Sequence, residues 1–138
     1  MAVETTLVLV KPDGMRRGLA GEIVMRLERR GFELRGARLL KIPRAVAQQH
    51  YAEHKGKAFF GDLVSFITSG PVLALAVRGE NAILGIRAMM GATNPADSAP
   101  GTIRGDFATE LSENIVHGSD SRASAKRELG LFFPDGLL

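Results

Sequence analysis

The clearest chemistry in this chain lies near its C-terminus, in the sequence Asn-Ile-Val-His-Gly-Ser-Asp at positions 114–120. The apolar pair Ile115 and Val116 is predicted to form a short buried strand, which Gly118 ends. His117 would therefore stand at the end of a strand. An imidazole in that place can attack a phosphorus atom and carry the phosphoryl group as a covalent intermediate.

A helix is predicted directly after this segment, over residues 122–129, with Asp120 or Ser121 as its N-cap. The free N–H groups at a helix N-terminus attract anions, which favours a phosphate beside His117. The alternative is a histidine with a structural role, in the core or as a cap. An isolated histidine does not distinguish these two roles, so the elements around it must.

The composition is that of one soluble globular domain over residues 1–138, with 45% hydrophobic and 24% charged residues. No run of about 18 apolar residues is present, so no membrane span is expected. Glu4 falls where the apolar part of a signal peptide would begin. Cysteine is absent, which excludes disulfides and thiolate chemistry and fits a cytoplasmic location. The net charge of +3 suits anionic ligands without requiring nucleic acid.

Two continuous apolar runs, residues 5–10 and 72–77, are predicted to be central strands of a sheet. Turn chemistry follows the first run, as Lys-Pro-Asp-Gly at residues 11–14. Lys11 is then the last residue of a core strand. It is either a surface lysine with a packed stem or a cation at a strand tip, where ligands of open α/β sheets bind.

A third, half-buried strand is predicted before Pro43, with an apolar face that Arg38 interrupts. Alternating positions supply that face: Phe32, Leu34, Leu40 and Ile42. Amphipathic helices are predicted over residues 19–30 and 81–90, each followed by a glycine. An αα-hairpin is predicted from two further helices, residues 44–53 and 62–68.

The resulting order of elements, βαβ(αα)βα-loop-βα, predicts an α/β (α+β) fold. The expected architecture is a ferredoxin-like four-stranded antiparallel sheet covered by helices, with an inserted helical hairpin. Residues 92–106, which contain two prolines and two glycines, form the long loop. A loop of this length inside a compact domain is usually functional, and it brings Thr93 and Arg104 within reach of a site.

The hairpin contains His-Tyr-Ala-Glu-His at residues 50–54, a match to the inverted zinc motif H-x-x-E-H. A catalytic zinc needs a third ligand and the chain has only one other histidine, so we interpret the pair as exposed histidines at a mobile helix end.

Phe59 lies outside the predicted packing face and is either a core aromatic or a surface for a stacked nucleobase. Arg87 borders the apolar face of its helix, as a surface arginine with a packed stem would.

Several segments of this chain together resemble the nucleoside diphosphate kinase family. The similarity covers residues 5–133 and includes the active-site signature of that family. The matching motifs are residues 11–14, 93–98, 100–106 and 114–120. The chain departs from the family pattern at Arg122, and it ends soon after Phe133 without the longer tail of many relatives.

The resemblance implies a ping-pong reaction. A nucleoside triphosphate would pass its γ-phosphoryl group to His117, the nucleophile, and a nucleoside diphosphate would collect it from the phosphohistidine. Lys11 would contact the phosphates and the sugar 3′-hydroxyl, and Asn114 would contact the sugar. The residues expected to hold the phosphates are Arg87, Thr93 and Arg104.

The resemblance also implies that Phe59 stacks on the base, with Leu111 opposite it. Tyr51 and Glu128 would support the phosphate and the histidine. Mg²⁺ would bind mainly through the nucleotide phosphates, and residues 92–106 would be a nucleotide-site loop. The family forms homo-oligomers, so a tetramer or a hexamer is expected.

Physical chemistry supports these roles. Phosphoryl transfer needs in-line positioning and neutralised oxygen charge, and three cations are available for that: Lys11, Arg87 and Arg104. Glu128 follows His117 by eleven residues. That is about 16 Å along a helix axis, so a contact between them requires the helix to run back across the strand.

Two other functions fit parts of the sequence. A pI of about 9.7 and a ferredoxin-like sheet suit a nucleic-acid-binding module. No strand carries the aromatic pattern of RNA-recognition domains, so no specific nucleic acid is expected as a partner. An inactive relative that only assembles with partners is disfavoured, because every motif residue is present. The G-x-x-x-x-G-K-[ST] loop of P-loop kinases is missing.

Overall fold

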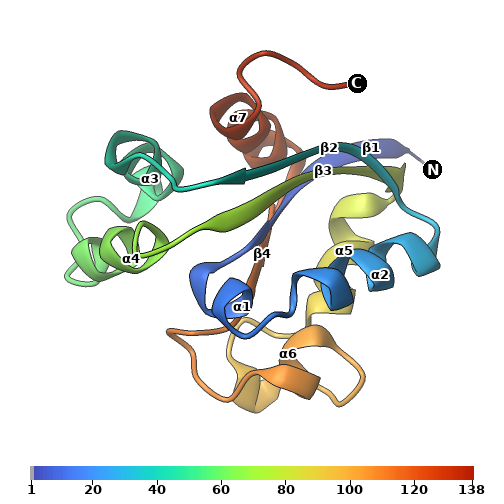
Figure 1. Ribbon diagram of the computed structural model, residues 1–138, viewed down its shortest axis with the longest axis horizontal. Helices are drawn as coiled ribbons and strands as arrows, with labels where there is room; N and C mark the ends of the chain where they lie inside the picture. Colours follow the sequence, from blue (N-terminus) through green and yellow to red (C-terminus); the bar gives the residue numbers. More distant parts are fainter. Residues whose placement is uncertain (1) are drawn as a thin grey trace.

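The computed structural model describes residues 2–138 (Figure 1). Its centre is a four-stranded sheet in the order β2-β3-β1-β4, and every neighbouring pair is antiparallel. The strands are β1 (Val3–Val10), β2 (Glu33–Leu40), β3 (Val72–Glu80) and β4 (Val116–Gly118). This is the ferredoxin-like strand order, so the predicted fold class is confirmed.

Helices cover both faces of the sheet (Figure 1). One face carries α2 (Ala20–Arg30), α5 (Ala82–Met90) and α6 (Ile103–Phe107). The other face carries α3 (Arg44–His50), α4 (Phe60–Ile67) and α7 (Arg122–Phe132). Three short helices complete the chain: α1 (Pro12–Arg16), η1 (Ala52–His54) and η2 (Pro95–Asp97). Within residues 2–138, no helix has both the length and the apolar character that crossing a membrane requires.

Each face of the sheet has its own hydrophobic cluster, and β1 contributes to both. Val8 and Val10 pack into the first cluster, beneath α2 and α5. Leu7 and Leu9 pack into the second cluster, beneath α3, α4 and α7. All four side chains are at most 1% exposed. Burial on both faces explains why the sequence of this strand is continuously apolar rather than alternating.

The single apolar face predicted for β2 is wrong, because the strand contains a bulge. Its pairing with β3 shifts register between Leu34 and Gly36. The extra residue reverses which side chains lie on which face. Leu34 packs against the first cluster and Leu40 against the second. Arg38 points toward α7, where it donates a hydrogen bond to the carbonyl oxygen of Phe132 at 2.8 Å.

Two segments predicted as a turn and a loop contain short helices. Pro12 starts α1 directly after Lys11, because its fixed φ and missing N–H suit the first helical position. Within residues 92–106, Asn94 caps η2 and Thr102 caps α6, each with a side-chain oxygen that accepts a backbone N–H. The segment therefore has a defined shape, as predicted, but much of it is helical.

The strand that holds His117 is displaced by one residue from its predicted position. The sequence predicts Ile115 inside the strand, whereas the structure places it before the strand with a φ of +75° and places Gly118 within the strand. The Ile115 N–H donates to Asp13 Oδ2 at 2.9 Å, and its carbonyl accepts from the Lys11 N–H at 2.8 Å. A positive φ is costly for a β-branched residue, so these two bonds stabilise the turn before His117.

The last helix agrees with its predicted start and exceeds its predicted length. Ser121 caps α7 by accepting the Ser124 N–H at 3.0 Å. The helix continues past Leu129 to Phe132, which is fully buried in the second cluster. The extra turn brings Phe132 into the core, and Glu128, which lies within the predicted length, contacts His117 of β4.

Candidate active site

His117 lies in the middle of β4, opposite Leu9 of β1. Directly opposed side chains of an antiparallel pair share a face, so His117 emerges on the face that α7 covers. Glu128 Oε1 lies 2.7 Å from His117 Nε2. Ser119 Oγ donates to the same carboxylate oxygen at 2.8 Å. The helix therefore runs back across the strand, as a contact between these two residues requires.

Glu128 determines which nitrogen of His117 carries the proton. Burial opposes ionisation of this carboxyl, but the hydrogen bond and the charge of His117 outweigh it, so the pKa of Glu128 lies below its ordinary value. An ionised carboxylate only accepts, so Nε2 must carry its hydrogen. The lone pair of the neutral ring is then on Nδ1, which has no hydrogen-bond partner among residues 2–138.

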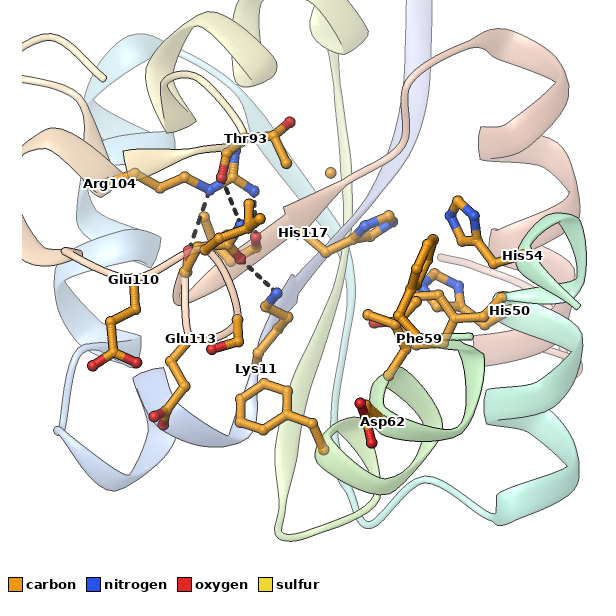
Figure 2. A pocket seen from close by; sticks show the side chains of 18 of the residues that line it. Lys11, His50, His54, Phe59, Asp62, Thr93, Arg104, Glu110, Glu113 and His117 are labelled. Atoms are coloured by element: carbon orange, nitrogen blue, oxygen red, sulfur yellow. Dashed lines mark hydrogen bonds between the residues drawn. The ribbon is translucent and has the colours of Figure 1, made fainter. Parts of the chain in front are cut away.

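Three residues from distant parts of the chain form a polar row beside His117. Lys11 Nζ donates to Asn114 Oδ1 at 2.5 Å, and Asn114 Nδ2 donates to the Thr93 carbonyl oxygen at 2.9 Å (Figure 2). Burial lowers the pKa of Lys11 to about 8, an effect that Asp13 opposes and Arg104 reinforces. Lys11 is therefore a poorly hydrated cation that is mostly charged at neutral pH.

Arg104 is only 5% exposed, and backbone carbonyls fix its guanidinium. Three of its five N–H groups donate to those oxygens at 2.7–3.2 Å. The acceptors are the carbonyls of Gly91, Asn114 and Val116. Burial and the nearby Arg87 lower the pKa of Arg104 to about 10, so it stays charged at neutral pH. Arg87 donates to the Gly118 carbonyl at 3.0 Å and adds a second guanidinium beside β4.

Every residue that the sequence assigns to the site lines one cavity of about 1260 Å³. In Figure 2, Lys11, Thr93 and Arg104 lie on one side of His117, and Phe59 lies on the other. The αα-hairpin forms one wall, and residues 92–118 form much of the other. A cavity of this size and polarity suits a ligand with an apolar part and an anionic part.

Two exposed apolar side chains lie at the outer end of the cavity. Phe59 is 46% exposed and Leu111 is 59% exposed, so neither is a core residue. Tyr51 lies deeper, near Glu128. Burial, together with the charge of Glu128, raises the pKa of Tyr51 to about 12, which keeps its phenol neutral. The cavity therefore combines a flat aromatic surface at its mouth with neutral groups, cations and the Glu128 carboxylate inside.

The interpretation of His50 and His54 as an exposed pair is wrong for His50, which is 4% exposed. Its ring packs edge-on against those of His117 and Tyr51, with both pairs of centroids 4.7 Å apart. Burial, with the charge of His117, lowers the pKa of His50 to about 3, so the ring is neutral at neutral pH. The zinc-like motif was the one sequence feature that singled out His50, and such a motif does not predict whether a side chain is buried.

Several lining or supporting residues have no role in the sequence-based site. Asp13 fixes the turn before His117, and Ser119 holds Glu128. Both residues lie inside motifs that the sequence analysis names, so membership of these motifs could have identified them as candidate site residues. Three acidic residues line the outer cavity, and no sequence pattern predicts their convergence: Asp62, Glu110 and Glu113.

Gly105 is predicted to be essential for the position of Arg104. A Cβ at this position would lie 1.9 Å from the Ala99 carbonyl oxygen, so Gly105→Ala must displace α6. We expect a loss of about 1–3 kcal/mol in the free energy of unfolding, measured by chemical denaturation. The matched control is Gly21→Ala, where a Cβ meets nothing within 4 Å. Equal stability of the two variants would contradict the steric argument.

Comparisons with known proteins agree with this geometry. The family model described as nucleoside diphosphate kinase matches residues 4–137. A nucleoside diphosphate kinase of Deinococcus radiodurans is 59% identical over 136 residues, which is 99% of each chain. One from Archaeoglobus fulgidus is 56% identical over 133 residues, 96% of this chain and 88% of the relative. The chain belongs to the nucleoside diphosphate kinase family.

Solved structures of nucleoside diphosphate kinases have the same fold. The Halobacterium salinarum enzyme, determined in complex with CDP, superposes with a TM-score of 0.96 at 49% identity, covering 99% of this chain and 92% of that one. A family protein from Babesia bovis gives a TM-score of 0.95 at 47% identity, covering 98% and 92%. As a nucleoside diphosphate kinase, this chain is a phosphotransferase that moves the γ-phosphoryl group of a nucleoside triphosphate to a nucleoside diphosphate by the ping-pong route of the family.

Proposed function

We propose that His117 is the nucleophile of this transfer and that its Nδ1 carries the phosphoryl group. The observation that carries this proposal is the 2.7 Å contact between His117 Nε2 and Glu128, which leaves the Nδ1 lone pair free. Nδ1 would attack the γ-phosphorus as the bond to the β-phosphate oxygen breaks. Glu128 would stabilise the positive charge that the ring gains, and the diphosphate would leave with the electron pair of the broken bond.

The three cations are proposed to neutralise the phosphate oxygens. Arg104 keeps two N–H groups free of backbone partners, and Arg87 and Lys11 line the same cavity. Thr93 would add a hydroxyl group at the cavity edge. Arranging these groups before the substrate arrives lowers the cost of stabilising charge in the transition state.

Mg²⁺ is proposed to enter with the nucleotide. Among residues 2–138, the one group of three potential ligands close enough for a single ion is His50, His117 and Glu128. Mg²⁺ prefers oxygen ligands in octahedral geometry, so this group does not suit it. The phosphate oxygens of the substrate supply what the protein lacks, and the bound ion would neutralise part of their charge.

The sugar and base are proposed to lie outward from His117. Lys11 and Asn114 already share a hydrogen bond and would contact the sugar hydroxyls. Phe59 would stack on the base with Leu111 opposite, and stacking has no donor–acceptor code, so base selectivity should be low. The CDP complex of the Halobacterium salinarum relative supports a nucleotide in this cavity.

Labelling tests the nucleophile directly. The protein is incubated with γ-labelled ATP and Mg²⁺ without an acceptor, and the modified residue is mapped under alkaline conditions, because phosphohistidine is acid-labile. We expect about one phosphoryl group per chain on His117, released on addition of a diphosphate. Label on a serine, or no label at all, would refute the proposal.

Activity is expected to fall above pH 8, because Lys11 loses its charge there. Its pKa is lowered to about 8 by burial, so the free enzyme holds the cation below that pH and loses it above. We expect kcat/KM to fall by at most about tenfold per pH unit on the alkaline side, since kcat/KM reports the free enzyme. A profile that stays flat to pH 10 would show that this charge is not required.

The domain organisation, location and oligomeric state are proposed from membership of the nucleoside diphosphate kinase family. We propose a single catalytic domain over residues 1–138, a cytoplasmic location and a homo-oligomer, either tetramer or hexamer. Light scattering of the purified chain distinguishes these assemblies from a monomer. Nucleic acid is not proposed as a partner, and salt-dependent RNA binding that ATP does not compete with would contradict that statement.

A further inference from the structure

His50, His117 and Glu128 converge into a group that the phosphotransfer reaction does not fully use. Each offers one ligand atom, and the three atoms lie within 4.8 Å of one another. They come from three separate elements: α3, β4 and α7. His50 Nδ1 is buried and has no hydrogen-bond partner in the described chain. A buried polar atom without a partner is uncommon and calls for an explanation.

The chemistry of this group is that of a zinc site. Two imidazoles and one carboxylate are the ligand set of several catalytic zinc centres, with water in the fourth position. Bonds of about 2.0–2.2 Å in a tetrahedron separate ligand atoms by about 3.3–3.6 Å. The group contains one pair at 2.7 Å and none beyond 4.8 Å, so the observed separations lie on either side of that spacing. The site opens into the cavity, which supplies the water.

Two of the three ligands, His50 and Glu128, can bind a metal without first losing a proton. His50 is neutral at neutral pH, because burial lowers its pKa to about 3, and Glu128 is ionised. Metal ligands must be deprotonated, so this state favours binding. Glu128 Oε2 faces Arg127 at 3.5 Å, and Ser119 holds Oε1, so the carboxylate is oriented before any ion arrives.

We propose that His50, His117 and Glu128 bind a zinc-class divalent cation in the nucleotide-free enzyme and that this ion inhibits phosphoryl transfer. A metal on His117 Nε2 displaces the hydrogen there to Nδ1, since a neutral ring keeps one hydrogen. The lone pair aimed at the substrate is then lost. The metal site stands on geometry alone, whereas its inhibitory effect rests on the proposed role of His117.

Histidine-selective ¹⁵N labelling tests the site in the full chain, which has three histidines. Zn²⁺ is titrated without nucleotide, and the ring nitrogens are observed by NMR. We expect signals of His50 and His117 to shift together at one equivalent, with His54 unchanged. Shifts confined to His54, or none at millimolar Zn²⁺, would overturn the proposal. This measurement needs no variant and does not depend on the folding of one.

Variants then separate the site from the zinc-like sequence motif. His50→Gln should weaken Zn²⁺ binding in calorimetry by at least about tenfold, while the matched control His54→Gln should leave it unchanged. Unchanged affinity in His50→Gln would overturn the site. Initial rates of His117 labelling are compared at fixed free Zn²⁺, set with a metal buffer. Zinc binding at His50 and His117 without slower labelling would refute the inhibition, whereas absence of label on His117 without zinc would refute its role as the nucleophile.

Discussion

Replacing His117 by alanine is expected to reduce phosphoryl transfer by about 10⁴-fold or more, because the covalent route loses its nucleophile. Stability should fall by about 2 kcal/mol or less, since Glu128 loses one hydrogen bond but keeps Ser119 and lies close to Arg127. Coupled kinetic assays with ATP and a diphosphate measure the first effect. Thermal unfolding measures the second.

The matched control for this substitution is His54→Ala. His54 lines the same cavity but does not contact Glu128, and its ring lies 5.4 Å from that of Phe59. We expect its activity to stay within a few-fold of the parent. If His117→Ala kept activity within tenfold, another group would be the nucleophile. If it failed to fold, the histidine would have the structural role that the sequence leaves open.

Removing the charge of Lys11 is the second change with a large expected effect. Lys11→Met keeps the apolar stem and deletes the ammonium group that donates to Asn114. We expect kcat/KM to fall by about 10²–10³-fold, the usual cost of losing one preorganised donor at developing charge. Stability should be unchanged or higher, because the folded chain no longer desolvates a cation. Steady-state kinetics and chemical denaturation measure the two quantities.

Lys126→Met provides the control for charge, since Lys126 is exposed on α7 and does not line the cavity. Its kinetics should match the parent. The alkaline fall in kcat/KM should also disappear in Lys11→Met, because the titrating group is gone. A variant that retains both full activity and the alkaline fall would assign that titration to another residue.

Local patterns in the sequence were sufficient for the fold class. Continuous apolar runs marked the two central strands, β1 and β3, and a glycine marked the end of α2, where Gly31 adopts a φ of +101°. These features depend on residues close in sequence, so periodicity and turn chemistry identify them. The motifs around Lys11 and His117 likewise gave the family, which the comparisons establish.

The errors in prediction have a common physical cause. The β2 bulge, the positive φ of Ile115 and the burial of His50 all depend on partners far away in the chain. Ile115 adopts its conformation because Asp13, 102 residues away, accepts its N–H. Local sequence propensities cannot predict such a long-range hydrogen bond. The alternation of apolar and polar residues likewise cannot reveal the extra residue that forms the bulge in β2.

Residue types and their order were therefore enough to name the candidate nucleophile, its cations and the reaction class. Tertiary structure alone decided which imidazole nitrogen is free, because that depends on α7 crossing β4 and bringing Glu128 to His117. It also decided that His50 joins them in a buried group. Both outcomes are set by the packing of helices onto the sheet, which brings together side chains that the sequence keeps apart.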